Sequence, residues 1–458
     1  MNNIVPRPVD RLLAPLSVFF AHKLAGAALL LGAAGLALLW AASPFGDSYR
    51  GMLHAHATVS LGGFVLEKTV HHWINDGLMA FFFFVVGLEL KREMLAGELS
   101  SLRQAALPVA CAVGGMVVPA GIYVAVNAGL PTMAGWGVPM ATDIAFALGV
   151  VALLGKRVSP AVKLLLTAIA VADDLGAILV IAVFYTSGLS LLALLVGCAL
   201  ALVSVGMNRL GVRSHLAYFL VGAAVWLCFL ASGVHATLAA VVMAFTIPAR
   251  TRLDSRGMVD ALGQLVHDYG QKALPPGHGL LEPFEQDVLH EIEHVVEKGT
   301  APLQRLEHAL MPLVTFVVLP MFAFANAGVT IAGSATEVLG SPIVLGIGLG
   351  LVVGKPLGIS LAAWLAVKAG LRLPAGVTPR DVFGIGMLAG IGFTMALFIG
   401  ELAFAEPALI DAAKVGTLVA SPIAGLLGYW LLRRGNADRN LSPPGSALPT
   451  RPVADPLQ

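Results

Sequence analysis

The chain has 458 residues, of which 57% are hydrophobic and only 12% are charged, and its formal net charge is +1. Soluble chains carry about 25% charged residues, so this composition excludes an ordinary soluble protein and indicates a polytopic membrane protein. The near-neutral charge and the lack of a basic aromatic cluster give no indication of nucleic-acid binding. The three cysteines lie singly in apolar segments, without a disulfide or metal pattern.

The N-terminal part predicts a polar segment followed by a first span. Residues 1–23 are polar, and residues 24–43 form a continuous apolar run. We interpret this run as a retained membrane span. A cleaved signal peptide is the alternative, because Ala41, Ala42 and Ser43 resemble a small-residue cleavage site, but the run is long for a signal core.

The weakly polar connection 46–72 predicts a β-hairpin. Residues 58–68 read as two short strands around Gly62 and Gly63. A lone hairpin is marginally stable in water, so we expect the 55–68 segment to pair with a second subunit in a homodimer. A flexible loop is the alternative interpretation.

Eleven further apolar segments of spanning length follow along the chain. They are predicted at 72–89, 105–126, 134–155, 160–185, 190–208, 214–231, 234–249, 305–327, 341–367, 382–403 and 409–432. Lysine and arginine fall on alternate connections, and only the hairpin loop, with Arg50 and Lys68, breaks the pattern. The positive-inside rule then places both termini in the cytoplasm, which requires an even number of spans.

A polar insert at 250–304 divides the membrane part into a first group, 24–249, with eight spans and a second group, 305–433, with four. Residues 434–458 predict a disordered C-terminal tail. Within the insert, His290 and His294 with Glu291 match the zinc-protease spacing, and Glu307 could be a distant third ligand. About 55 polar residues are too few for a protease site, so adventitious metal binding is the most that the spacing indicates.

Two adjacent carboxylates, Asp173 and Asp174, lie near the middle of the apolar stretch 167–184. An ionised group at the centre of a spanning helix costs roughly 2.5–3.5 kcal/mol on insertion scales. Both acids therefore need protons, cations, a basic partner or water. Because neighbouring helical residues point about 100° apart, one acid can face a cavity while the other faces a neighbouring helix.

Two spans carry signals of an interruption. Pro139, Thr142 and Asp143 fall within the fourth span, and Gly390 and Gly392 fall within the eleventh. Such breaks are tolerated at membrane depth where protein covers the backbone or a cavity is lined, and an acid there can balance the positive ends of half-helices. Corresponding breaks in two halves indicate an inverted-repeat transporter with its site at the midplane. A purely structural cap is the alternative for Asp143.

Other polar residues are candidates for the site or its approach. Lys355 lies within an apolar span, and we favour pairing with a buried acid over a structural role in which the side chain snorkels to the interface. The Gly354-Lys355 pair resembles part of a phosphate-binding loop, but the rest of that pattern is missing. His235 opens a span and is a proton-sensor or a structural histidine. The remaining candidates, which we expect at the cytoplasmic mouth or in its approach, are Asp76, Glu89, Arg92, Glu93, Glu307 and His308. Screened surface charge is the alternative.

Eight motifs in order resemble those of the NhaA sodium/proton antiporters. They are Trp73-Ile-Asn-Asp-Gly-Leu-Met-Ala80, Gly87-Leu-Glu-Leu-Lys-Arg-Glu93, Ala141-Thr-Asp-Ile-Ala-Phe-Ala-Leu-Gly149, Asp173-Asp-Leu-Gly-Ala177, Gly233-Val-His-Ala-Thr237, Phe322-Ala-Phe-Ala-Asn-Ala-Gly328, Gly354-Lys-Pro-Leu-Gly-Ile-Ser360 and Gly390-Ile-Gly-Phe-Thr-Met395. The resemblance covers roughly residues 15–433 apart from the insert.

The resemblance implies an all-α polytopic fold of twelve spans with inverted repeats, two crossing interrupted helices and a hairpin-mediated dimer. It implies that Asp174 is the principal sodium, lithium and proton carboxylate, joined by Asp173, which can pair with Lys355. Thr142 and Asp143 then lie at the crossing. The pH-regulating cluster would comprise Glu89, Arg92, Glu93, Glu307 and His308.

Two departures from the family pattern concern regulation. The family usually has a second histidine three positions after His308, before proline, whereas here Met311 precedes Pro312. The insert also lengthens the loop that leads to this cluster. Both features put the pH set-point in doubt and leave the ion site intact.

The resulting expectation is an electrogenic sodium or lithium/proton antiporter of the bacterial inner membrane, a secondary transporter rather than an enzyme, with lipid contacts and no cofactor. A sodium-coupled symporter of an organic solute is the alternative. An intramembrane aspartyl protease built on Asp143 and Asp174 is a remote one, because Gly390-Ile-Gly392 is followed by phenylalanine where such enzymes carry aspartate.

Overall fold

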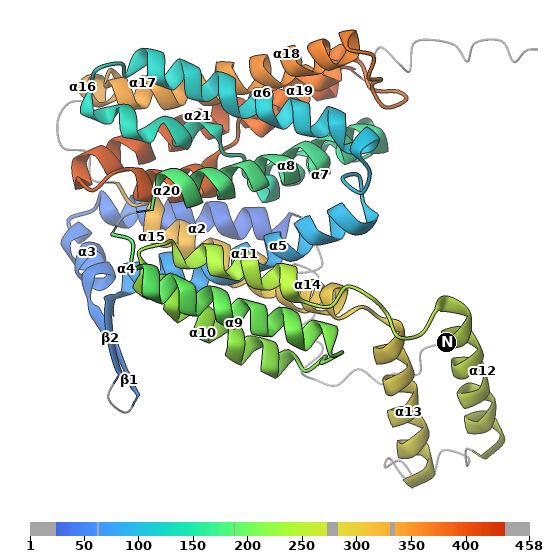
Figure 1. Cartoon of the computed structure of the whole chain (residues 1–458). Coiled ribbons are helices and arrows are strands. Elements are labelled where there is room, and N and C mark those ends of the chain that lie inside the picture. Colours follow the sequence, from blue (N-terminus) through green and yellow to red (C-terminus); the bar gives the residue numbers. More distant parts are fainter. Residues whose placement is uncertain (1–23, 62–63, 187, 273–282, 330–334, 436–458) are drawn as a thin grey trace, which may run out of the picture.

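The structure is a computed structural model that describes residues 24–61, 64–186, 188–272, 283–329 and 335–435. In these residues, helices joined by short connections make up the fold, together with one β-hairpin (Figure 1). The predicted N-terminal segment, the centre of the hairpin turn and nearly all of the predicted tail lie outside the described residues. Within them, eight helices are long and apolar enough to cross a membrane, or up to eleven if each bent pair is one span. The chain is therefore an all-α multi-pass membrane protein.

The eight long helices match predicted spans to within a few residues at most ends. They are α4–η1–α5 (Val70–Ala96), α6 (Leu102–Val126), α8 (Pro160–Phe184), α9 (Leu191–Arg209), α10 (His215–Ser232), α14–η4–α15 (Pro302–Ala327), α17–η5–α18 (Pro342–Lys368) and α21 (Pro407–Gly435). The helix α11 (Ala236–Thr246) is apolar but shorter. Three of the long helices contain a π-helical turn, η1 (Trp73–Leu78), η4 (Val314–Val318) and η5 (Gly350–Gly354), which was not predicted.

Three further apolar elements are bent pairs. The fourth predicted span consists of the 3₁₀ helix η2 (Pro131–Met140), α7 (Ile144–Leu154) and η3 (Gly155–Arg157), bent by 40°, and the eleventh consists of α19 (Pro379–Ala389) and α20 (Phe393–Ala403), bent by 50°. Both predicted interruptions are thus confirmed. The third pair is α2 (Ala25–Ala41) with α3 (Gly46–His54), which turns by 114°.

The helix α3 lies in a stretch that was predicted to be a connection without helix. Its polarity is mixed, so it lacks the apolar run that marks a span, but one side of it is buried through Tyr49 and Leu53. The Tyr49 hydroxyl donates to the Phe324 carbonyl at 2.6 Å. A tertiary contact to α15 therefore stabilises a short helix that the local sequence does not indicate.

The predicted hairpin is present as β1 (His56–Leu61) and β2 (Phe64–Thr69), paired antiparallel with His56 opposite Thr69. It projects from one end of the helical bundle (Figure 1). At the other end, the insert forms a helical hairpin of α12 (Ser255–Lys272) and α13 (Pro283–Gly299), which stands away from the bundle. Most of its surface is exposed, whereas Val288 and Val295 are buried.

The centre of the bundle is α8. Of its most apolar 18 residues 67% are buried, against 17% of the corresponding residues of α9. Small residues allow close packing around it. A Cβ atom on Gly358 of α18 would lie 2.1 Å from the Gly114 carbonyl oxygen of α6, so these two helices meet backbone to backbone. This packing brings α18, which carries Lys355, against the layer that contains α8.

Candidate functional site

The two interrupted spans cross and satisfy each other's backbone groups. The Thr142 hydroxyl donates to the Ala389 carbonyl at 2.8 Å, and the Asp143 backbone N–H donates to the Ile391 carbonyl at 2.7 Å. A Cβ atom on Gly390 would lie 2.4 Å from the Leu351 carbonyl oxygen, so the second break requires glycine where neighbouring backbone approaches. The freed ends of each half-helix are therefore paired inside protein, as membrane depth demands.

The Asp143 carboxylate caps two half-helices at once. Its Oδ1 accepts the Phe146 N–H at 3.0 Å at the start of α7, and its Oδ2 accepts the Thr394 N–H at 3.1 Å and the Thr394 hydroxyl at 2.5 Å at the start of α20. Both helix starts carry positive partial charge, which stabilises an anion. This buried acid (2% exposed) is thus fully engaged in holding the crossing together.

The Lys355 ammonium donates to Asp173 Oδ2 at 2.6 Å, and the two side chains are 0% and 2% exposed. Lys355 is the first residue of α18, directly after the π-helical turn η5. The other oxygen, Asp173 Oδ1, is buried and accepts no hydrogen bond from the described residues. The two side chains together are therefore close to charge-neutral, and Asp173 Oδ1 is available to a further ligand.

Asp174 points to a different environment from its neighbour. It lines a cavity of about 570 Å³, together with Glu89, Thr142, Asp143 and His308. Asp174 is 4% exposed, and among the described residues no side chain or backbone group donates a hydrogen bond to its carboxylate. Burial disfavours its ionised form, so a proton or a cation must neutralise it.

The predicted regulatory residues meet at the mouth of this cavity. The Arg92 guanidinium pairs with Glu307, lies 3.1 Å from Glu93 and lies 3.7 Å from Glu89. His308 borders the same cavity and is exposed. Late α5 and early α14 thus bring these five residues into one cluster, as the sequence predicted. Met311, the departure from the family pattern, also lines the cavity.

Two candidates lie away from this cluster. Asp76 sits in η1 at the other end of the same helix, 2.9 Å from His72, so the expectation that it belongs to the mouth is wrong. Asp76 and Glu89 are 13 positions apart, which separates them by about 20 Å along a helix. His235 precedes α11, and its Nε2 lies 2.7 Å from the Tyr185 carbonyl oxygen; it too is remote from Arg92.

The histidine pair of the insert is exposed. His290 and His294 are 87% and 54% exposed, and each lies near the glutamate three residues on. Glu307, the suggested third ligand, is paired with Arg92. Within the described residues no group of three or more histidine, cysteine, aspartate or glutamate side chains could hold a metal ion.

Thr394 is a site residue that sequence reasoning did not single out. It lies inside the motif Gly390-Ile-Gly-Phe-Thr-Met395, and its hydroxyl and backbone N–H both donate to Asp143. A hydroxyl residue two positions after a glycine break was the available signal. The π-helical turn before Lys355 had no signal, because its hydrogen-bond shift leaves no mark in composition.

Comparison with known proteins gives a consistent result. The family model described as Na⁺/H⁺ antiporter 1 matches residues 17–432. A protein of Oleidesulfovibrio alaskensis named Na(+)/H(+) antiporter NhaA is 51% identical over 429 residues, which cover 93% of this chain and 95% of that protein. Proteins with the same name from Acidithiobacillus ferrooxidans and Koribacter versatilis are 48% and 44% identical, over 92% and 97% of this chain and 98% and 96% of theirs.

Proposed function

We propose, from the premise that this chain belongs to the Na⁺/H⁺ antiporter 1 family, that it is a sodium/proton antiporter whose exchange site is Asp174. The relatives named above are all called antiporters, and none of these names favours sodium-coupled symport of an organic solute. The protein is thus a transporter and not an enzyme. That it is a secondary active transporter, driven by the proton gradient, is part of the proposal.

One observation carries the assignment of the site. Of the residues that the structure describes, three acids line the cavity, and two of them have partners: Asp143 caps two half-helices, and Glu89 lies near Arg92. Asp174 alone is both buried and without a hydrogen-bond donor among the described residues. It is therefore the cavity carboxylate that is available to a transported ion.

Competition for this carboxylate explains exchange. A buried carboxylate can hold a proton or coordinate a small hard cation, and neutralisation by one removes the need for the other. Asp173 Oδ1 and the Thr142 hydroxyl oxygen are neighbouring oxygen ligands of the kind that Na⁺ or Li⁺ prefers. A site that changes its exposed side only when it is neutralised would exchange the two ions.

The Asp173–Lys355 pair offers a second proton-binding group. If Na⁺ recruits Asp173 as a ligand, the Lys355 ammonium loses its partner inside low-dielectric surroundings and its charged form is disfavoured. Binding of one sodium ion would then release a proton from Asp174 and another from Lys355. Exchange would be electrogenic, and inward proton movement would drive sodium or lithium outward.

The proposal also covers the regulation of the protein and its place in the cell. Arg92 with its three glutamates and His308 would regulate access as the cytoplasmic pH changes. We place the protein in a bacterial inner membrane with both termini cytoplasmic, in contact with lipid, dimeric through the 55–68 hairpin and without a cofactor. The mouth then faces the cytoplasm, on the side of the insert.

An ion panel tests the function directly. Everted membrane vesicles that contain the protein are acidified by respiration, and a pH-sensitive dye reports proton release after sodium, lithium, potassium or an organic solute is added. We expect sodium and lithium, but not potassium, to dissipate the pH gradient without any solute. Sodium movement that requires a solute would replace antiport with symport.

A further inference from the structure

A second buried polar cluster lies at the end of the bundle opposite to the cavity mouth. Its residues come from four helices: His71 and Asn75 from α4 and η1, Asn326 from α15, Glu401 from α20 and Lys414 from α21. We call these five residues the polar clasp. The sequence analysis proposed no role for any of them, although Asn75 and Asn326 lie inside two of the quoted motifs, and none of them is among the residues that line the cavity.

Glu401 and Lys414 form the centre of the polar clasp. The Lys414 Nζ and Glu401 Oε1 lie 2.7 Å apart, and the side chains are only 10% and 13% exposed. His71 Nε2 lies 3.8 Å from the same carboxylate oxygen. The charge of Lys414 and the proximity of His71 make this a mostly buried ion pair with a titratable neighbour.

Amide side chains extend the polar clasp to α15. Asn326 Nδ2 donates to Asn75 Oδ1 at 2.8 Å, Asn75 Nδ2 donates to Asn326 Oδ1 at 3.3 Å, and His71 Nε2 lies 3.1 Å from Asn326 Oδ1. Among the described residues of the clasp, the contact that joins α20 and α21 to α4, η1 and α15 is the approach of His71 to Glu401 at 3.8 Å. The Glu401–Lys414 pair and the amide pair each hold together one of the two sides. The amide contacts join η1 to α15, which are separated by 251 residues in the sequence.

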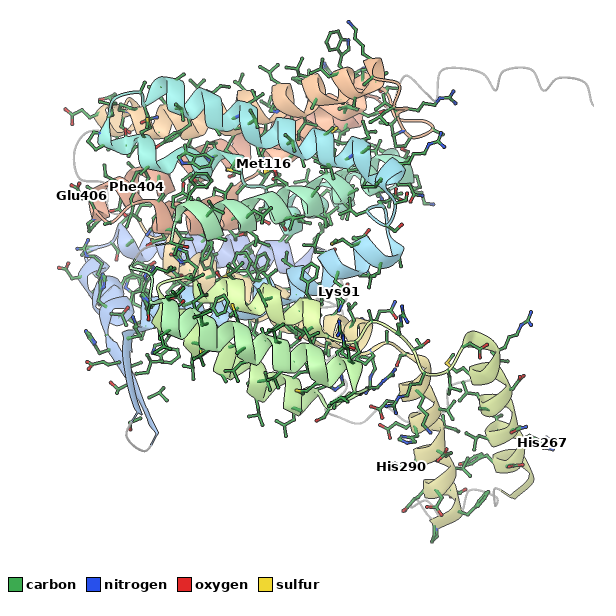
Figure 2. All side chains as sticks on the ribbon, viewed as in Figure 1. Lys91, Met116, His267, His290, Phe404 and Glu406 are labelled. Carbon is green, nitrogen blue, oxygen red and sulfur yellow. The ribbon has the colours of Figure 1, made fainter. Side chains whose placement is uncertain are left out.

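The position of the polar clasp is set by helices that also carry site residues. His71 precedes Glu89 by 18 residues, and Asn326 follows Glu307 by 19, so each helix places the clasp about 27 Å from the mouth. Figure 2 shows Glu406, just beyond α20, at the end where the β-hairpin leaves, and Lys91 nearer the insert. The cavity mouth and the clasp therefore lie at opposite ends of the helical bundle.

The helix α20 connects the polar clasp to the exchange site. It begins beside Asp143, which accepts from Thr394, and it carries Glu401 two turns later, about 10 Å along the axis. At this position Glu401 lies 3.8 Å from His71 of α4, so a rotation of α20 relative to α4 would part the two side chains. The contact between Glu401 and His71 can thus be present when Asp174 faces the cavity and absent when the site faces the opposite end of the bundle.

From this geometry we propose that the polar clasp closes the far end of the path and stabilises the state in which Asp174 faces the cavity. Glu401 and Lys414 act as positioning residues, because they touch neither the cavity nor Asp174. This inference rests on the proposed antiport. A contact present in only one of two states shifts their populations, and the apparent affinity on each side follows the fraction of the competent state.

The measurement is the sodium KM on each side of the membrane. Everted vesicles present the mouth to the medium, and right-side-out vesicles present the far end. We expect His71→Phe and Glu401→Gln, which each remove a partner of the bridging contact, to raise the KM on the mouth side and lower it on the far side, so that the ratio of the two rises about tenfold. Lys414→Arg keeps the ion pair and is expected to keep the parent ratio.

A double variant separates this role from a structural one. Glu401→Gln and Lys414→Met together leave no buried charge unpaired, so protein yield and thermal stability should return toward the parent values. The ratio of the two KM values should stay raised, because the contact of the Glu401 carboxylate with His71 is still absent. The matched control is Glu406→Gln, an exposed carboxylate five residues from Glu401, which should change neither quantity.

The outcomes are distinct. A double variant that exchanges sodium with the parent KM ratio overturns the role of the polar clasp, and so does an equal shift in Glu406→Gln. A raised ratio in the double variant together with restored stability supports it. If the parent protein exchanges no sodium for protons in either kind of vesicle, the proposed function fails, and the role of the clasp fails with it.

Discussion

The crossing site and the insert are both rich in titratable side chains, yet their surroundings differ. At the crossing, Asp143, Asp173, Asp174 and Lys355 are all at most 4% exposed. In the insert hairpin, His290 is 87% exposed and pairs at best with a glutamate on its own helix. Titratable side chains therefore stand in low-dielectric protein in one region and in water in the other.

This difference decides what a charge does in each region. Exposed ion pairs contribute about 0–1 kcal/mol, because water screens them and long side chains lose entropy. A buried charge that loses its partner costs about 3–5 kcal/mol. The comparison teaches that a zinc-like spacing such as His290 with His294 carries little information by itself, whereas two acids in an apolar helix carry much.

The largest effect that this comparison predicts is loss of exchange in Asp174→Asn. The amide has the same shape but neither binds a proton at neutral pH nor offers a negative charge to Na⁺, so sodium-dependent proton release in everted vesicles should disappear. The protein should remain in the membrane at a normal level.

The matching change in the insert is the double variant His290→Ala with His294→Ala, which should exchange sodium at the parent rate. Exchange that persists in Asp174→Asn would refute the site, and a strong loss in the histidine variant would show that the insert takes part in transport.

A smaller but still large effect is expected on stability in Lys355→Ala. Removal of the ammonium leaves Asp173 buried without its partner, which should cost about 3–5 kcal/mol unless the acid takes up a proton, and the pH dependence of exchange should change as well. Thermal unfolding of the purified protein in detergent measures this loss. Lys368→Ala on the same helix is the control, because that lysine is exposed and stacks on Trp364. Equal unfolding temperatures for the two variants would contradict a stabilising role of the Lys355–Asp173 ion pair.

The smallest effect is expected in the insert, at Glu297→Gln. The hydrogen bond from Arg305, at 2.7 Å, lowers the pKa of Glu297 below its ordinary value of 4.5. A carboxylate with a lowered folded-state pKa stabilises the fold above its unfolded pKa and loses that contribution as the pH falls through the folded value. Because this side chain is 44% exposed, the loss at pH 7 should be below about 1 kcal/mol.

Thermal unfolding of parent and Glu297→Gln at pH 7 and pH 3 measures this contribution. The difference should be small at pH 7 and absent at pH 3. A difference that grows on acidification would contradict the sign of the lowered pKa.

Residues that stand out from their neighbours could be predicted from the sequence. Asp173, Asp174 and Lys355 lie in apolar runs, so their burial and their need for a partner follow from hydrocarbon surroundings alone. The two breaks were visible because Pro139 with Asp143, and Gly390 with Gly392, interrupt apolar runs of spanning length. Glu401 and Lys414 were not, because they lie near the ends of predicted spans, where charged residues are ordinary.

Asp76 shows the opposite kind of error. Its sequence position in the same span as Glu89 suggested a shared cluster, but a helix places residues 13 positions apart at different membrane depths. The short helix α3 was missed because its stability comes from the contact of Tyr49 with α15 rather than from its own composition.

The sequence by itself determined the spans, the two interruptions and the presence of charges at membrane depth, because apolar surroundings impose a demand that each segment reveals on its own. Only the tertiary structure decided which partner meets that demand. Lys355 pairs with Asp173, 182 residues away, and leaves Asp174 on the cavity. That choice depends on how the helices pack, since adjacent residues of one helix face different neighbours and a distance of a few ångströms decides which acid stays available for an ion.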